Sequence, residues 1–165
     1  MIDIMSQDPA TVVREVLQEY ADRGVFRALR EVRTRGGRAE FSILCFPFTE
    51  EPFTLIYAAG SQSLTFKNLL KDIPARSDMY CQFKEYMKER TSPDLPDHRR
   101  IDPDRAELKW SNRLGSVNVS LHVKGNQHEY AVRKGMNLLT DIFLDLLTES
   151  TYYEYMISHF DMPEE

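Results

Sequence analysis

The fold of this chain is decided by residues 117–133, Val-Asn-Val-Ser-Leu-His-Val-Lys-Gly-Asn-Gln-His-Glu-Tyr-Ala-Val-Arg. Apolar residues occupy every second position from Val117 to Val123, and polar residues stand between them. This period of two is typical of a strand with one buried face. Gly125-Asn126 has the composition of a two-residue turn with glycine at the first central position. We therefore predict an antiparallel hairpin that returns as far as Arg133.

The turn also predicts which residues of this hairpin face each other. His122 would lie opposite Glu129, and a carboxylate there would hold the charge and tautomer of the imidazole. The two side chains are therefore a speculative proton-handling pair, but no motif ties a Ser or Cys nucleophile to them. A cross-strand pair on the surface is the favoured interpretation. The remaining predicted pairs are Val123 with His128, Leu121 with Tyr130, Val119 with Val132, and Asn118 with Arg133.

The bulk properties of the chain indicate one globular domain over residues 1–165. Its 165 residues suffice for a single core, and 42% apolar with 28% charged residues is ordinary for a folded protein. A net charge of -5 disfavours a general nucleic-acid binder. No apolar run approaches the ~20 residues of a membrane-spanning helix, and the N-terminus lacks the features of a signal peptide. We expect a cytoplasmic protein without membrane insertion.

Motifs that would indicate a cofactor or a metal are missing from the sequence. Cys45 and Cys81 are the only cysteines and form no Cys-x-x-Cys pair, which argues against a disulfide scaffold, a zinc site and a redox motif. Neither a glycine-rich phosphate-binding loop nor a nucleophile elbow is present. We predict no cofactor, no metal and no catalytic residue.

The first half of the chain predicts a helix, several strands and a second helix. Asp8-Pro9 has the composition of a helix start, and the helix is expected to end near Arg23-Gly24. Residues 25–33 fit both a helix and a strand, and the following Arg35-Gly36-Gly37-Arg38 turn favours the strand. Ala39 to Phe48 reads as a central or bulged strand. Phe53 to Lys67 reads as a hairpin about Gly60-Ser61, which pairs Tyr57 with Leu64 and Leu55 with Phe66.

The second half predicts a helix, a loop, more strands and a long final helix. Ser77 or Asp78 is expected to cap a helix that stops before Pro93. The proline-rich segment 91–105 reads as an exposed crossover loop between two halves of one domain. Leu108 and Trp110 would begin the second half of the sheet. From Leu138 to Phe160 an apolar band wider than one helix face suggests a homodimer contact. Its candidate interaction residues are Tyr152, Tyr153, Met156, Ile157 and Phe160.

Two groups of charged residues have both a functional and a structural explanation. Asp141, Asp145 and Glu149 share one helix face, and five further residues gather in the crossover loop, but neither group has the spacing of a known metal site. Solvated surfaces explain both. Arginines crowd around the first turn, where Arg30 and Arg33 are candidates for binding an anion or an acidic partner, although charges that guard an edge strand explain them as well. The loop residues are Asp94, Asp97, His98, Asp102 and Asp104, and the other arginines are Arg27, Arg35 and Arg38.

The element order resembles that of type III secretion chaperones and of the YbjN-like bacterial proteins that share their fold. The segments that carry this resemblance are the helices over 8–24, 77–90 and 138–160 and the hairpins about Gly60-Ser61 and Gly125-Asn126. The resemblance implies a homodimer that binds extended segments of partner proteins and catalyses nothing. It is one of topology, so it assigns no functional residue.

These observations predict an α+β fold in which an antiparallel sheet of about five to seven strands packs against an N-terminal, a middle and a long C-terminal helix. The predicted function is that of a non-enzymatic, chaperone-like interaction module. It would bind a partner protein through hydrophobic patches and sheet edges. The alternative is a small-molecule-binding domain or an enzyme with a pocket between the sheet and the C-terminal helix.

Overall fold

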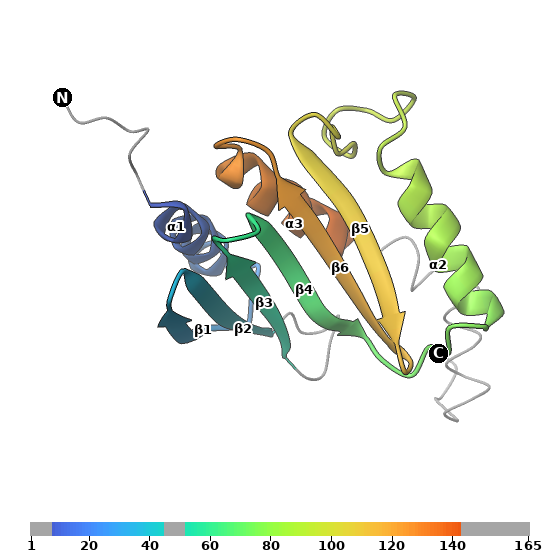
Figure 1. The fold of residues 1–165 in the computed structure, drawn as a ribbon, viewed down its shortest axis with the longest axis horizontal. Helices are drawn as coiled ribbons and strands as arrows, with labels where there is room; N and C mark the ends of the chain where they lie inside the picture. Colours follow the sequence, from blue (N-terminus) through green and yellow to red (C-terminus); the bar gives the residue numbers. More distant parts are fainter. Residues whose placement is uncertain (1–7, 45–51, 143–165) are drawn as a thin grey trace.

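A computed structural model of the chain describes residues 8–44 and 52–142, and these form an α+β fold (Figure 1). Within these ranges there is one antiparallel sheet of six strands, accompanied by three helices. The elements in chain order are α1 (Pro9–Asp22), β1 (Ala28–Arg35), β2 (Arg38–Leu44), β3 (Phe53–Ala58), β4 (Ser63–Leu70), α2 (Asp78–Glu89), β5 (Ala106–Arg113), β6 (Ser116–Val123) and α3 (His128–Asp141).

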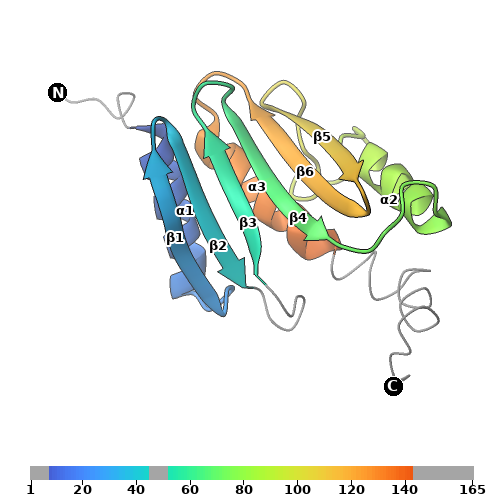
Figure 2. The ribbon, with the colours of Figure 1, turned by 60° about the horizontal axis from the view of Figure 1, so that its bottom comes forward.

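The sheet has the strand order β1-β2-β3-β4-β6-β5, so β1 and β5 are its edges. The first four strands form a meander, and the crossover through α2 and residues 91–105 brings β6 beside β4. Helices α1 and α3 lie side by side on one face of the sheet, and α2 lies at its β5 side (Figure 2). No element covers the other face in the described part of the chain. None of the described helices is long and apolar enough to cross a bilayer.

The predicted turns between β1 and β4 are confirmed. Gly36 and Gly37 connect β1 to β2 with φ of 59° and 79°, values that glycine adopts without strain. Residues 28–35 are therefore a strand, as the turn predicted. The β3–β4 hairpin has the expected register, with Tyr57 opposite Leu64 and Leu55 opposite Phe66.

The two predicted helix starts are also confirmed. Asp8 precedes α1, with Pro9 at its first position, and the Ser77 hydroxyl accepts a hydrogen bond from the Tyr80 amide at 3.1 Å. This bond satisfies one of the free amides of the first turn of α2. Of the long helix predicted over 138–160, the structure describes only the part inside α3. Residues 143–165 lie outside the described ranges, as does the end of the strand predicted over 39–48.

The hairpin predicted over residues 117–133 is wrong in its second half. The alternation of β6 is as predicted, but after Gly125 the chain enters α3 instead of a strand. His128, Ala131, Val132 and Gly135 are the buried residues at the start of α3, at the i, i+3, i+4, i+7 spacing of a helix. In the strand interpretation Tyr130 and Val132 share one face and Glu129 and Arg133 the other, but Ala131 breaks this alternation. The helical spacing fits all four buried positions.

The true hairpin partner of β6 is β5. The two strands are joined at Leu114 and Gly115, which have φ of 54° and 89°. Their register runs without interruption from Ala106 opposite Val123 to Arg113 opposite Ser116. Because β6 pairs with β4 on its other side, it is an interior strand, and the cross-strand pairs predicted with residues 128–133 do not exist.

One side of the sheet forms the core with α1 and α3. The inward side chains of the central strands are at most 1% exposed, and the buried residues of α1 pack against the same cluster. Gly135 lets α3 approach closely, since a Cβ atom at this position would lie 2.7 Å from Cζ of Phe66. The central inward residues are Phe41, Leu55, Tyr57, Leu64, Phe66, Val119 and Leu121.

We predict that Gly135→Ala lowers the free energy of unfolding by about 1–3 kcal/mol, because Phe66 is buried on all sides and cannot move away. The measurement is equilibrium unfolding in urea. Gly60→Ala is the matched control, since no atom lies within 4 Å of the added Cβ there. Equal stability of wild type and Gly135→Ala would contradict the close approach of α3 to β4.

Candidate interaction surface

The sheet face turned away from α1 and α3 is mostly polar, with Ile56 and Ala58 of β3 as the apolar residues in its middle rows. Strand register aligns its residues in rows across the sheet. We call this surface the open face. One row holds Arg38, Ala58, Ser63, His122 and Glu107; the next holds Glu40, Ile56, Thr65, Ser120 and Lys109; the third contains Arg30, Ser42, Thr54 and Lys67.

Short side chains fill the middle of the open face and long cationic ones surround them. Its cations are Arg30, Arg35, Arg38, Lys67 and Lys109, together with Arg113 at the end of β5, and its acids are Glu40 and Glu107. Six cations against two acids leave the face positively charged, although the whole chain carries a net charge of -5. The rows contain no aromatic residue that would stack on a nucleic-acid base.

The strongest positive charge lies at the β1–β2 turn. Arg35 is directly opposite Arg38, and like charges in this position destabilise a strand pair. Arg38 forms an ion pair with Glu40 at 3.2 Å, whereas the side chains of Arg30 and Arg35 have no hydrogen bond or ion pair with any described residue. For Arg33 only the backbone is described, and it lies opposite Glu40. The turn therefore holds cations available to an acidic partner.

The two edge strands differ in how well they can accept another strand. A bulge between Glu31 and Arg33 interrupts β1, and it leaves Val32 49% exposed. A bulged, charged edge disfavours the addition of a long strand. β5 has a regular register along its whole length, so it is the better template for backbone pairing.

The predicted pair of His122 and Glu129 is not formed. His122 is exposed on the open face, whereas Glu129 lies on α3. The Glu129 carboxylate accepts a hydrogen bond from Arg133 at 2.9 Å, and Arg133 also donates to Glu19 of α1 at 2.8 and 3.1 Å. The bond from Arg133 holds the pKa of Glu19 below its usual range. Glu129 thus belongs to the contact between α1 and α3.

Sequence reasoning missed the buried pair of Tyr57 and His128. The Tyr57 hydroxyl lies 3.0 Å from Nε2 of His128, and the rings meet edge to face at 82°. Burial lowers the pKa of His128 and raises that of Tyr57. The two residues are 5% and 1% exposed, so a substrate in solution cannot reach them. Their bond fixes the first turn of α3 on the sheet.

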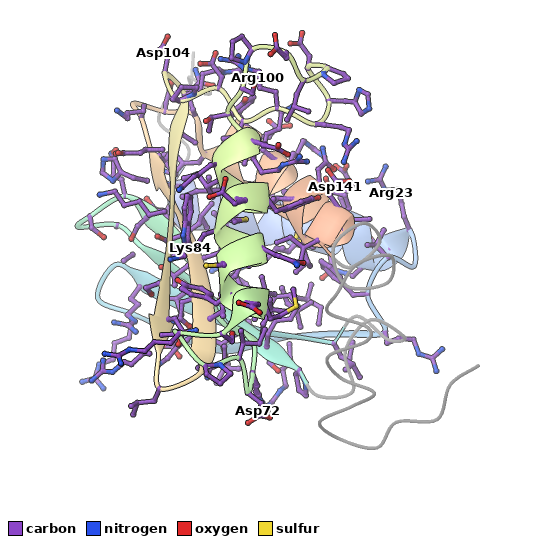
Figure 3. The ribbon with its side chains drawn as sticks, turned by 90° about the vertical axis from the view of Figure 1, so that its right-hand side faces the viewer. Arg23, Asp72, Lys84, Arg100, Asp104 and Asp141 are labelled. Carbon is purple, nitrogen blue, oxygen red and sulfur yellow. The ribbon has the colours of Figure 1, made fainter. Side chains whose placement is uncertain are left out.

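The predicted acidic groups do not form a metal site in the part of the chain that is described, where no three His, Cys, Asp or Glu residues lie close enough to hold an ion. Asp141 forms an ion pair with Arg99 at 3.5 Å and is labelled in Figure 3. Asp145 and Glu149 lie outside the described ranges, as do the predicted interaction residues between Tyr152 and Phe160. In the crossover loop, Asp102 accepts a hydrogen bond from the Asp104 amide at 2.9 Å, which stabilises a turn.

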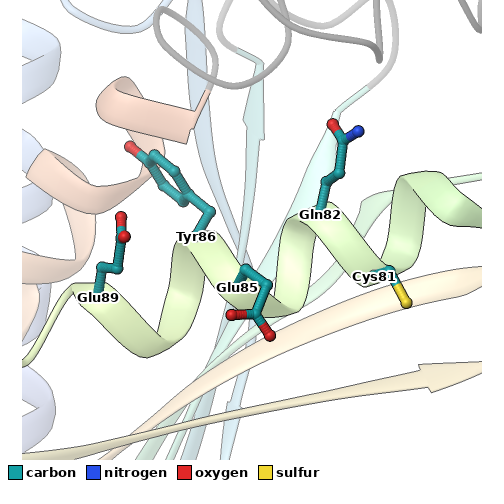
Figure 4. A pocket seen from close by; sticks show the side chains of 5 residues that line it. All are labelled: Cys81, Gln82, Glu85, Tyr86 and Glu89. Atoms are coloured by element: carbon teal, nitrogen blue, oxygen red, sulfur yellow. The ribbon is translucent and has the colours of Figure 1, made fainter.

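A hollow of about 370 Å³ lies beside α2, and the described residues that line it all belong to that helix (Figure 4). The pocket expected between the sheet and the C-terminal helix would involve residues 143–165, which lie outside the described ranges. That space is filled where the structure describes it, since Phe66 and Leu121 approach Gly135 closely and are at most 1% exposed. The lining residues of the hollow are Cys81, Gln82, Glu85, Tyr86 and Glu89.

Comparison of the chain with protein-family models, with curated proteins and with solved structures gave no match. The arrangement of the side chains must therefore carry the functional argument. Among the described residues, the open face combines uncompensated charge with an accessible surface.

We predict that the free energy of unfolding falls as the pH is lowered below the ordinary histidine pKa of 6.5. The unfolded chain binds a proton at His128 in that range, whereas the folded chain resists it because its pKa is lowered. The loss should continue until the pH reaches the lowered pKa of the folded state. Urea unfolding at a series of pH values measures it.

The double variant Tyr57→Phe/His128→Phe should lose this part of the pH dependence, because it removes both hydrogen-bonding partners and keeps rings of similar shape. His122→Gln is the control, since His122 is exposed on the open face. If the double variant kept the full slope of the wild type, another group would be responsible.

Proposed function

We propose that this chain is a non-enzymatic interaction module that binds an acidic segment of a partner protein on its open face. The observation that carries the proposal is the excess of cations there, in particular Arg30 and Arg35, which lack partners among the described residues. Arginine forms strong paired hydrogen bonds with carboxylates, so an acidic segment is the complementary ligand.

The shape of the open face supports an extended or helical protein segment as the ligand. The central side chains are short, so a partner backbone can approach the sheet and bond to their hydroxyl groups. Ser42, Thr54, Thr65 and Ser120 supply such hydroxyls in the middle strands. At one border of the sheet the regular edge of β5 offers backbone hydrogen bonds as well. An enzyme or small-molecule carrier would instead need an enclosed pocket, and the hollow on α2 is an open surface feature.

The proposal includes a homodimer that acts in the cytoplasm in a chaperone-like role. The wide apolar band over residues 138–160 supports the dimer, and the resemblance in element order to secretion chaperones supports the role. The contact would use Tyr152, Tyr153, Met156, Ile157 and Phe160.

We predict that the double charge reversal Arg30→Glu/Arg35→Glu weakens the binding of an acidic peptide by at least about tenfold, since each lost charge-assisted contact is worth roughly 1.5–3 kcal/mol. The probe is a fluorescently labelled peptide of alternating Glu and Thr, and its anisotropy is followed at low and at moderate salt. Binding to the wild type should weaken with salt, as expected for exposed charges.

The matched control is Lys84→Glu/Lys88→Glu on α2, which changes the net charge by the same amount on a different element. If the control variant lost as much affinity as the open-face variant, the effect would be one of net charge alone. That outcome would contradict the assignment of the open face.

We predict that Tyr153→Ser/Ile157→Ser converts a homodimer to a monomer, because two apolar side chains of the proposed contact would be replaced by polar ones. Size-exclusion chromatography with light scattering on the full chain measures the mass. A wild-type monomer at micromolar concentrations would contradict the dimer, and a dimeric variant would place the contact elsewhere.

A further inference from the structure

Three cationic side chains lie near one another where the crossover loop contacts α3, on the helix-covered side of the sheet. Lys134 comes from α3, and Arg100 and Arg105 come from the loop of residues 91–105. Figure 3 shows Arg100 in this loop, beyond the end of α2. Lys134 and Arg100 are half-buried and Arg105 is exposed, so solutes can reach the cluster.

The ring of Tyr130 holds two of these cations in place. The Arg105 guanidinium carbon lies 3.7 Å from the ring centroid, and Lys134 Nζ lies 5.6 Å from the same centroid. The Tyr130 hydroxyl is itself fixed, since it accepts a hydrogen bond from the Asp102 amide at 2.9 Å. A guanidinium stacked on an aromatic ring keeps its donors in the plane, where they can bind a ligand.

Several donors of the cluster are uncommitted. Arg105 donates through Nε to Gln127 at 3.0 Å, and Arg100 donates through Nε to the Thr91 carbonyl at 3.3 Å. The Nη groups of both arginines have no hydrogen bond with any other described residue. The Lys134 ammonium group donates one hydrogen bond to the Asp97 carbonyl, and its two other protons remain able to bind a ligand.

The positive charge of the cluster is only partly compensated. Burial lowers the pKa of Lys134, and Arg105 and Arg100 lower it further, while Asp97 opposes them. The remaining loop acids near Arg105 are Asp102, whose carboxylate is engaged by the Asp104 amide, and Asp104 itself. Binding of an anion between these side chains would therefore reduce the repulsion among the three cations.

We propose that Arg100, Arg105 and Lys134 form a binding site for a phosphate-type oxyanion, either free phosphate or a phosphate monoester. An ion with several oxygens can accept hydrogen bonds from two guanidinium groups and an ammonium group at once. The site is separate from the open face, so it does not depend on the function proposed above. It would add recognition of a phosphorylated group to an interaction module.

The test is isothermal titration of the full chain with inorganic phosphate and with O-phosphoserine, at constant ionic strength in chloride. We expect binding of one or both ligands, with a dissociation constant below ~10 mM. Preference for inorganic phosphate would identify the free ion as the ligand, and preference for O-phosphoserine would identify a phosphate monoester. Absence of binding of both would overturn the proposal.

Arg105→Gln should weaken binding about tenfold or more, because it removes one charged fork from the site. Arg105 is exposed, and circular dichroism should show that the variant remains folded. Lys88→Gln on α2 is the matched control and should bind like the wild type. Equal phosphate binding by Arg105→Gln and the wild type would overturn the assignment. The open-face variant Arg30→Glu/Arg35→Glu should bind phosphate like the wild type. This result is expected whether or not the open face binds an acidic peptide.

Discussion

The structure depends on burial of one side of the sheet, and no described element covers the other side. Side chains alternate between the two faces of a strand, so packing Leu55, Phe66 and Val119 under α1 and α3 commits their neighbours to the other face. The close approach of α3 at Gly135 completes the buried side. The open face is therefore a necessary product of the fold. The positive charge of the open face is not required by the fold, because neutral polar residues would give the same alternation of buried and exposed side chains.

The helices are held on the sheet by a few specific contacts in addition to apolar packing. Tyr57 and His128 fix the start of α3, and Arg14 of α1 donates two hydrogen bonds to Glu31 of β1 at 2.7 and 2.9 Å. Arg133 joins α3 to Glu19 of α1. These ion pairs are partly exposed, so each contributes little to stability. Their effect is to orient the helices on the sheet. Arg35 has no such structural partner among the described residues, and its side chain is therefore a candidate for binding a ligand.

Local chemistry explains which elements could be predicted from the sequence. The Gly36-Gly37 turn and the Ser77 cap each follow from a requirement of the residues themselves. The start of α3 was predicted wrongly, because residues 128–133 are too few to establish a period of two, and the helical spacing becomes clear only when Gly135 and Met136 are included. The β5–β6 turn contains Leu114 with positive φ, which is uncommon for leucine. Tyr57 and His128 are 71 positions apart, and only the fold brings them together. The arginines around the Gly36-Gly37 turn are visible in the sequence as a group of positive charges. The other residues of the open face can be identified only from the register of the strands.

We propose the open face as the surface that meets a partner. A titration of the ¹⁵N-labelled full chain with the acidic peptide, followed by amide chemical shifts, tests this directly. The largest shifts should fall in β1, β2 and β4, around Arg30, Arg35 and Lys67. Shifts confined to α2 and α3, with β1 and β2 unchanged at saturation, would contradict the account.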